Sequence, residues 1–270
     1  MTAVSLIDYA QGAGETQSKP ESYLNIYERY FSHMRDDAVT ILELGVATGK
    51  SMLMWSDYFS KGTIVGIDLF PPGSEMPTMP RNENRIHMYR GAQNDTEFLS
   101  RVSNEIAPNG FDIIIDDAAH IGELAKVSFS HLFLKHLKPG GIYGLEDWGT
   151  GYWQGHAYYP DGRRFKEPGD GRTFLHQIAN KALKNAPVEW PSLTWMQKLL
   201  KPYQYVSRFR SHEYGMPGVI KQLIDEVARS DWSSLPYGTE PKEKRPSYIE
   251  SILISPGVTL VTKSRSAPMG

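Results

Sequence analysis

Two short acidic stretches hold the side chains best suited to do chemistry. The first, Asp-Asp-Ala-Ala-His, occupies residues 116–120, and the second is Glu146-Asp147. Ions such as Mg²⁺ prefer oxygen ligands and keep several positions for water or substrate. A histidine beside such an ion can accept a proton as a general base. The combination predicts metal-assisted deprotonation of a bound hydroxyl group.

Three of these acids, Asp117, Glu146 and Asp147, are the predicted metal ligands. Like charges at neighbouring strand ends repel one another unless a cation or a proton compensates, and a divalent ion is the simplest compensation. Three ligands would leave about three positions of a Mg²⁺ ion for substrate hydroxyls and water. His120 follows Asp117 by three residues and is the predicted general base. The alternative is that the acids only cap helices and pair with Lys or Arg, with His120 as a polar surface residue.

A glycine-containing turn predicts a nucleotide site. Glu43-Leu-Gly-Val-Ala-Thr-Gly49 follows an apolar run and precedes a segment that can continue as a helix. Its glycines let the backbone approach a ligand, and helix N–H groups favour an anion. Asp68 closes the next apolar run, nineteen residues after Gly49, near the offset at which an acid binds ribose hydroxyls. Together they predict an adenosine-containing ligand, although the glycines and the Asp could also be only turns and caps.

The middle position of this turn separates two ligand classes. Dinucleotide sites carry Gly-x-Gly-x-x-Gly, because a pyrophosphate needs close backbone approach. This chain has Ala47 at the middle position, between Gly45 and Gly49. The departure favours S-adenosylmethionine, whose methionine tail needs less space, over a nicotinamide cofactor.

The elements that must position these residues alternate along the chain. Continuous apolar runs that end in Gly or an acid predict buried strands, and the segments between them predict helices. Such a pattern predicts an α/β fold with a parallel sheet covered on both faces, whose ligands lie at the carboxyl ends of the strands. The predicted strands are 39–45, 63–68, 85–91, 111–117 and 141–147, and the helices 51–59, 96–105, 124–137 and 219–228. A terminal hairpin, 248–255 and 258–263, would add an antiparallel strand.

Two regions outside this pattern suggest a division of the chain. Residues 1–36 are predicted as an N-terminal helical preface, with one amphipathic helix at Glu21–Met34. The catalytic domain would be 37–270, with an insertion at about 149–215 that mixes Gly, Pro, aromatic and basic residues without a clean period. We interpret the insertion as an aromatic-rich lid. Its aromatic residues could cover a sugar or only pack the lid: Tyr152, Trp153, Tyr158, Tyr159, Phe165 and Trp195.

The composition limits the class of protein. The chain has 270 residues, enough for one domain with a sizeable insertion, since compact cores stop growing at roughly 250–300 residues. Its 29 Lys and Arg against 31 Asp and Glu leave a net charge of −2, which gives no global field for nucleic acid. The absence of Cys excludes disulfides and thiol nucleophiles. Without a signal segment or an apolar run of roughly 20 residues, we expect a cytoplasmic protein with no membrane span.

The acidic stretches are the most specific motifs in the chain. Asp-Asp-Ala-Ala-His at 116–120, followed by Leu-Glu-Asp-Trp-Gly-Thr-Gly-Tyr-Trp at 145–153, resembles the metal-dependent sugar O-methyltransferases of macrolide biosynthesis, of the mycinamicin and macrocin type. The resemblance runs from about Tyr23 to Lys263. These are class I S-adenosylmethionine-dependent methyltransferases, so it implies a Rossmann-like sheet that ends in an antiparallel hairpin strand, with S-adenosylmethionine and Mg²⁺ as cofactors.

The resemblance also implies roles for single residues. Glu43 and the loop from Gly45 to Gly49 would border the methionine part of the cofactor, and Asp68 would hold its ribose. Gln93 would flank adenine, and Asp116 would face the cofactor. Asp117, Glu146 and Asp147 match the family's metal ligands, and His120 matches its catalytic base.

The expected activity is therefore methyl transfer from S-adenosylmethionine to a hydroxyl, on a sugar of a glycosylated natural product or a glycan. The expected partner is a small hydroxylated molecule, with no nucleic acid, and we expect a homo-oligomer. A catechol acceptor is an alternative because it too offers adjacent oxygens to a metal. A nicotinamide-dependent oxidoreductase on the same sheet is a more distant one. A relative without activity is disfavoured by the retained acids and His120.

Overall fold

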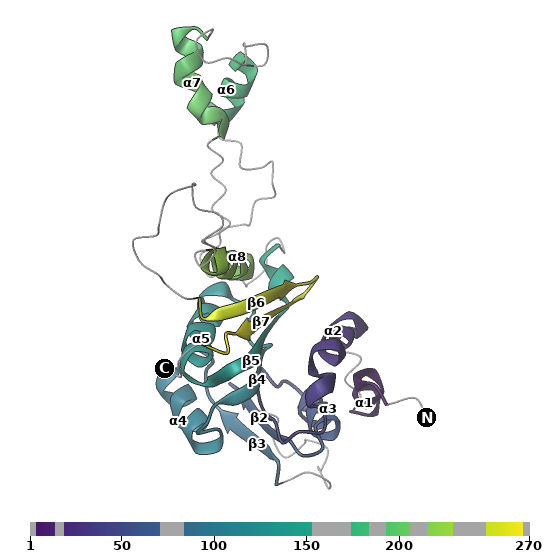
Figure 1. Cartoon of the computed structure of the whole chain (residues 1–270). Helices are drawn as coiled ribbons and strands as arrows, with labels where there is room; N and C mark the ends of the chain where they lie inside the picture. The colour runs from purple at the N-terminus through teal and green to yellow at the C-terminus, as the bar shows by residue number, and fades with distance from the viewer. Residues whose placement is uncertain are drawn as a thin grey trace.

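A computed structural model describes residues 4–13, 19–70, 84–152, 174–183, 193–205, 215–228 and 247–266. Within this part, seven strands form one sheet in the order β3-β2-β1-β4-β5-β7-β6, with helices on both faces (Figure 1). The strands are β1 Thr40–Leu44, β2 Thr63–Asp68, β3 Ile86–Arg90, β4 Phe111–Asp116, β5 Leu137–Glu146, β6 Ile249–Ile254 and β7 Val258–Lys263.

The sheet has the predicted mixed topology. Strands β1 to β5 pair in parallel, and β7 pairs antiparallel with β5 and with β6. The strand order reverses at β1, which lies between β2 and β4. In open α/β sheets, the crevice outside such a reversal is where ligands bind. The predicted fold class, a mostly parallel sheet with a C-terminal antiparallel hairpin, is confirmed.

Helices cover both faces because the central strands are apolar on both sides. One face carries α1 Leu6–Ala13, α2 Glu21–Phe31 and α3 Lys50–Tyr58, and the other carries α4 Thr96–Ile106, α5 Gly122–Lys135 and α8 Gly215–Ala228 (Figure 1). Each face has its own buried cluster of side chains. The N-terminal helices belong to one of them, since Tyr27 packs in the same cluster as Ile41 and Ile113 of the sheet. The preface is thus packed directly onto the sheet.

Two local predictions were wrong. The helix predicted to end at Leu137 ends at Lys135, and β5 already begins at Leu137, so Pro139 and Gly140 lie inside a strand. The reason is an irregularity in the pairing of β4 with β5 between Phe111 and Ile113, where a proline without an N–H group is tolerated. Helix α1 was not predicted.

The predicted lid is described only in part. Within 149–215 the structure has the end of a short 3-10 turn, Trp148–Tyr152, and two helices that pack against each other, α6 Phe174–Leu183 and α7 Trp195–Tyr205. Trp195 is 70% exposed. The aromatic residues Trp153, Tyr158, Tyr159 and Phe165 lie outside the described residues, so the lid and the division at residue 36 stay predictions. None of the described helices is long and apolar enough to cross a bilayer.

Candidate active site

A cavity of about 270 Å³ opens at the carboxyl ends of β1 to β4, at the reversal of strand order. Its wall includes Gly45, Asp68, Gln93 and Asp117, one from each of the loops or strand ends that meet there. We call this the glycine-loop cavity. Strand ends converge here because the strands are parallel, which is why acids spaced far apart in the sequence become neighbours.

Asp68 ties the glycine turn to the end of β2. Its Oδ2 accepts hydrogen bonds from the backbone N–H of Val46 at 2.8 Å and of Ala47 at 3.1 Å, and its Oδ1 accepts from Phe70 N–H at 2.7 Å. Partial burial acts to raise the pKa of the Asp68 carboxyl, but these N–H groups outweigh it and the pKa lies below its ordinary value. The side chain therefore presents a charged carboxylate at the cavity wall.

The glycines of the turn allow close packing of two loops, in addition to leaving room for a ligand. Gly45 has φ +84°, and a Cβ at this position would lie 2.2 Å from the backbone O of Asp117. Gly49, at φ 80°, precedes the first residue of α3. Ala47, at the middle position of the turn, has φ 47°, a left-handed backbone without a glycine. The turn thus approaches the loop that follows β4 so closely that no side chain fits at Gly45.

Gln93 and Asp116 form a buried network behind the cavity. The Gln93 amide donates to Asp116 Oδ1 at 3.1 Å and accepts from the backbone N–H of Ala119 at 3.0 Å. Asp116 Oδ2 accepts from the hydroxyls of Ser128 at 2.7 Å and Tyr143 at 3.1 Å. Burial raises the pKa of Asp116, and these donors oppose the rise. The network holds the loop between Asp117 and His120.

Three of the predicted metal and base residues come together next to this loop. Single ligand atoms of Asp117, His120 and Asp147 all lie within 4.8 Å of one another. The Nε2 of His120 is 3.8 Å from Asp117 Oδ1 and 3.7 Å from Asp147 Oδ2. His120 and Asp147 have φ of 52° and 50°, a strained conformation that clusters at functional sites. We call Asp117, His120, Glu146 and Asp147 the acid centre.

The donor set of the acid centre fits a hard divalent ion. Asp117 and Asp147 offer carboxylate oxygens and are partly exposed, at 26% and 44% of their side chains, so substrate and solvent can reach them. A hard cation prefers such oxygens and retains open positions. Asp117 belongs both to this centre and to the wall of the glycine-loop cavity. A metal held here would therefore adjoin a ligand in the cavity.

Glu146 lies in a different environment from the other acids. It is 2% exposed, and its two carboxylate oxygens lie 2.8 and 2.9 Å from the Nζ of Lys19. Burial and the charge of Asp117 hold the pKa of Glu146 above its ordinary value, although Lys19 and the hydroxyl of Tyr27 act in the opposite direction. Its role as a metal ligand stays a prediction. Its observed partners are a lysine and a tyrosine that sequence reasoning did not place at the site.

The N-terminal segment supplies these additional residues. Lys19 lies two residues before α2, and Tyr23 and Tyr27 lie within it. Together they contact four acids, Glu43, Asp117, Glu146 and Asp147. Burial alone would lower the pKa of Lys19, but the surrounding carboxylates outweigh it and hold that pKa well above its ordinary value. For the two tyrosines a sequence signal exists, because both lie in the predicted amphipathic helix Glu21–Met34. No such signal marks Lys19.

The remaining predicted cofactor residues are placed differently. Glu43 is fully buried, with Oε1 3.4 Å from Lys19 Nζ, and like Asp116 it does not line the cavity. Gly49 is also absent from the described wall. Gly45, Asp68 and Gln93 do line it. The structure therefore brings half of the predicted cofactor set to the cavity and places the two other acids behind it.

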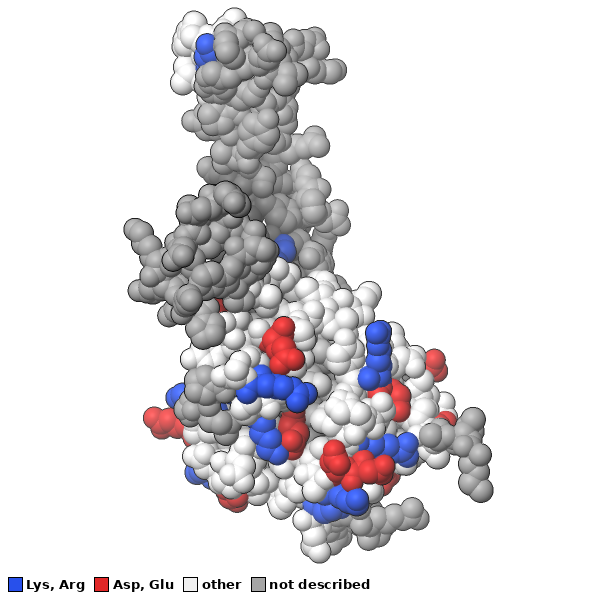
Figure 2. Space-filling view, viewed as in Figure 1, with Lys and Arg blue, Asp and Glu red and all other residues white. Residues whose placement is uncertain are grey.

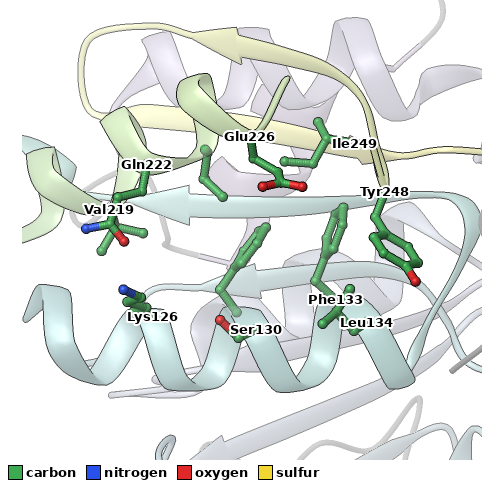
Figure 3. A pocket seen from close by; sticks show the side chains of 11 residues that line it. Lys126, Ser130, Phe133, Leu134, Val219, Gln222, Glu226, Tyr248 and Ile249 are labelled. Carbon is green, nitrogen blue, oxygen red and sulfur yellow. The ribbon is translucent and has the colours of Figure 1, made fainter. Parts of the chain in front are cut away.

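A second, larger cavity of about 440 Å³ lies away from this chemistry. It runs between α5, α8 and the start of β6, with Phe133, Val219 and Ile249 among its lining residues (Figure 3). None of the predicted site residues lines it. On the face in Figure 2, the Lys and Arg side chains of the described residues are interspersed with Asp and Glu, without a broad field of one sign.

Known proteins resemble the chain in both sequence and structure, although no protein-family model matches it. It is 33% identical over 217 residues to the mycinamicin VI 2''-O-methyltransferase of Micromonospora griseorubida, covering 76% of this chain and 52% of that protein. It is 39% identical over 146 residues to the L-olivosyl-oleandolide 3-O-methyltransferase of Streptomyces antibioticus, covering 51% of this chain and 35% of that protein. The chain spans about half, or less, of the length of these curated relatives.

A solved methyltransferase structure resembles nearly the whole chain. The MycE methyltransferase of the mycinamycin biosynthetic pathway, in complex with Mg and S-adenosylhomocysteine, is 26% identical with a TM-score of 0.63, covering 97% of this chain and 55% of that one. The resemblance stated from the motifs is thereby confirmed. By sheet order, glycine turn and relatives together, the chain is a homologue of the class I S-adenosylmethionine-dependent sugar O-methyltransferases of macrolide biosynthesis.

Proposed function

We propose that this chain transfers a methyl group from S-adenosylmethionine to a hydroxyl on a sugar of a glycosylated natural product or a glycan, with the help of a divalent ion such as Mg²⁺. The observation that carries the proposal is the position of Asp117. It lines the glycine-loop cavity and also converges with His120 and Asp147 on one point. A donor in the cavity and an acceptor at the acid centre would therefore meet at this residue.

The glycine-loop cavity is the proposed S-adenosylmethionine site. Asp68 presents a charged carboxylate that can accept hydrogen bonds from ribose hydroxyls. Gln93 lies at the wall near the position proposed for adenine, and Gly45 at the position proposed for the methionine part. Glu43 and Asp116 would act on this site through neighbouring residues, because both are buried and neither lines the cavity.

At the acid centre, Asp117 and Asp147 would hold the ion, with Glu146 beside them on the end of β5. When bound, a divalent ion supplies Lewis acidity that orients neighbouring acceptor oxygens and eases loss of a hydroxyl proton. The Nε2 of His120 would take that proton. The hydroxyl oxygen would then form a bond to the methyl carbon as the carbon–sulfur bond breaks, releasing S-adenosylhomocysteine. The sulfonium is already reactive, so the protein mainly supplies position and deprotonation.

The names of the relatives support a glycosylated acceptor. They include methyltransferases of mycinamicin VI, of L-olivosyl-oleandolide and of rhamnosyl tetracenomycin C. The last two of these names state a glycosyl group, olivosyl or rhamnosyl, on the molecule that is methylated. We propose a small glycosylated substrate for this chain as well, together with a homo-oligomeric assembly and a cytoplasmic location.

Chelation gives the direct test. We expect exhaustive EDTA treatment to reduce turnover by more than about 100-fold, measured with labelled S-adenosylmethionine and a panel of glycosylated macrolides, free sugars and catechols. Affinity for S-adenosylhomocysteine should stay within about threefold, because the proposed cofactor site uses no metal ligand other than the wall residue Asp117. Added Mg²⁺ should restore turnover.

The panel also separates the alternatives. Turnover that persists after chelation would remove the metal from the mechanism. Methylation of catechols, without methylation of any glycoside, would replace the sugar acceptor with an aromatic one.

A further inference from the structure

One basic side chain is buried among the acids of the site. The Nζ of Lys19 lies 2.9 Å from Asp117 Oδ2, 2.8 Å from Glu146 Oε1 and 3.4 Å from Glu43 Oε1. Lys19 is 1% exposed. A lysine is almost never buried this fully unless it is paired. Its ammonium thus occupies a cation position formed by acids from the ends of three strands, β1, β4 and β5.

Asp117 lies between the Lys19 ammonium and the rest of the acid centre. Its Oδ2 faces Lys19, whereas its Oδ1 lies on the side of His120 and Asp147. The hydroxyl of Tyr23 donates to Asp147 Oδ1 at 2.6 Å. The acids therefore offer two adjacent positions for positive charge, and Lys19, two residues before α2, fills one of them.

The burial of two of these acids favours a permanent cation between them. Glu43 and Glu146 are buried at 0% and 2% exposure, and a carboxylate removed from water is strongly destabilising without a cation or several hydrogen bonds. The exchangeable metal cannot compensate them before it binds. A lysine that belongs to the chain can compensate them at all times.

We propose that Lys19 is the permanent counter-cation of a two-cation centre: its ammonium keeps Glu43, Asp117 and Glu146 assembled without metal and leaves the Asp117–His120–Asp147 side open for the exchangeable dication. The part that concerns the exchangeable dication rests on the proposed function. The carboxyl groups of Glu43, Asp117, Glu146 and Asp147 would then share two cations, the ammonium of Lys19 on one side and the exchangeable dication on the other.

Removal of the charge of Lys19 tests whether this residue stabilises the acids without metal. In EDTA, Lys19→Met should lower the melting temperature by about 10 °C, because it leaves buried carboxylates without their partner. Lys138→Met is the matched control: Lys138 pairs with Asp112 at 2.8 Å at the opposite end of the sheet, but its side chain is 34% exposed. That variant should shift by less than about 3 °C. A Lys19→Met shift as small as that of the control would overturn the proposal.

A double variant that also removes the charge of Glu146 decides the question if Lys19→Met alone does not fold. Lys19→Met with Glu146→Gln removes one positive and one negative charge from the same position, while Tyr27 retains an oxygen acceptor. It should recover at least about half of the lost melting temperature, or restore soluble protein. Lys19→Met with Asp112→Asn should recover none. Equal behaviour of the two double variants would overturn the proposal.

Metal binding tests the two positions and separates this inference from the proposed function. Saturating Mn²⁺ should raise the melting temperature of Lys19→Met by more than that of wild type, because an ion can also enter the vacated position. An equal or smaller rise would overturn the assignment of a cation position to Lys19. If calorimetry shows no Mn²⁺ bound to wild type, the proposed metal fails, whereas the comparison in EDTA still decides the role of Lys19.

Discussion

The glycine-loop cavity and the acid centre share Asp117, yet they are held together by different means. At the cavity, Asp68 accepts hydrogen bonds from backbone N–H groups of its own loop and of the glycine turn. At the acid centre, the contact of Lys19 with Glu146 joins side chains 127 residues apart. Backbone contacts depend on conformation, whereas compensation of buried charge depends on one particular side chain. Mutations should therefore affect the two regions separately, except at the residues that join them.

The largest expected effect is at the acid centre alone. His120→Ala should lower kcat by about 10²–10⁴-fold, the usual contribution of a general base, with affinity for S-adenosylhomocysteine within about threefold of wild type. Steady-state kinetics and calorimetry measure the two quantities. His33→Ala, in an exposed position of the preface, is the control. A Mn²⁺ affinity reduced by more than about tenfold would instead make His120 a metal ligand.

The next largest effect is expected where the two regions touch. Gly45→Ala should lower the free energy of unfolding by about 2–5 kcal/mol, because the added Cβ meets the backbone of Asp117 at a left-handed φ. Chemical denaturation measures the change. Gly12→Ala provides a control of opposite sign: it has no atom within 4 Å of its added Cβ, so in α1 it should stabilise by about 0.5–1 kcal/mol. A neutral Gly45→Ala would show that the two loops can separate freely.

The smallest effect should be confined to the cavity. Asp68→Ala should weaken S-adenosylhomocysteine by about 10–100-fold, since it removes a ribose acceptor and loosens the turn. Mn²⁺ affinity should stay within about threefold, because the side chain does not contact the acid centre. Asp37→Ala, at an exposed position, serves as control. Unchanged binding of S-adenosylhomocysteine would mean that Asp68 only supports the glycine turn.

Much of this arrangement was visible in the sequence because it has a local cause. The apolar runs that end at Asp68, Asp116 and Glu146 became strands of one sheet, and their acids met at one edge because the strands are parallel. Gly45 and Gly49 were recognised from a turn whose left-handed φ values require them. Lys19 was missed, since nothing within its own segment distinguishes it from a solvated lysine.

What the sequence determined by itself is the order of strands and helices, the glycine turn and the set of acids at the strand ends, since periodicity and turn chemistry act over a few residues. What only the tertiary structure decided is the set of neighbours around each acid. Asp116 turns inward to Gln93 and Ser128, and Glu146 faces Lys19, whereas Asp117 and Asp147 remain open to a ligand. The reason is physical: a buried carboxylate is stabilised by whichever donors or cations the fold brings within about 3 Å, and that neighbourhood does not follow from distance along the chain.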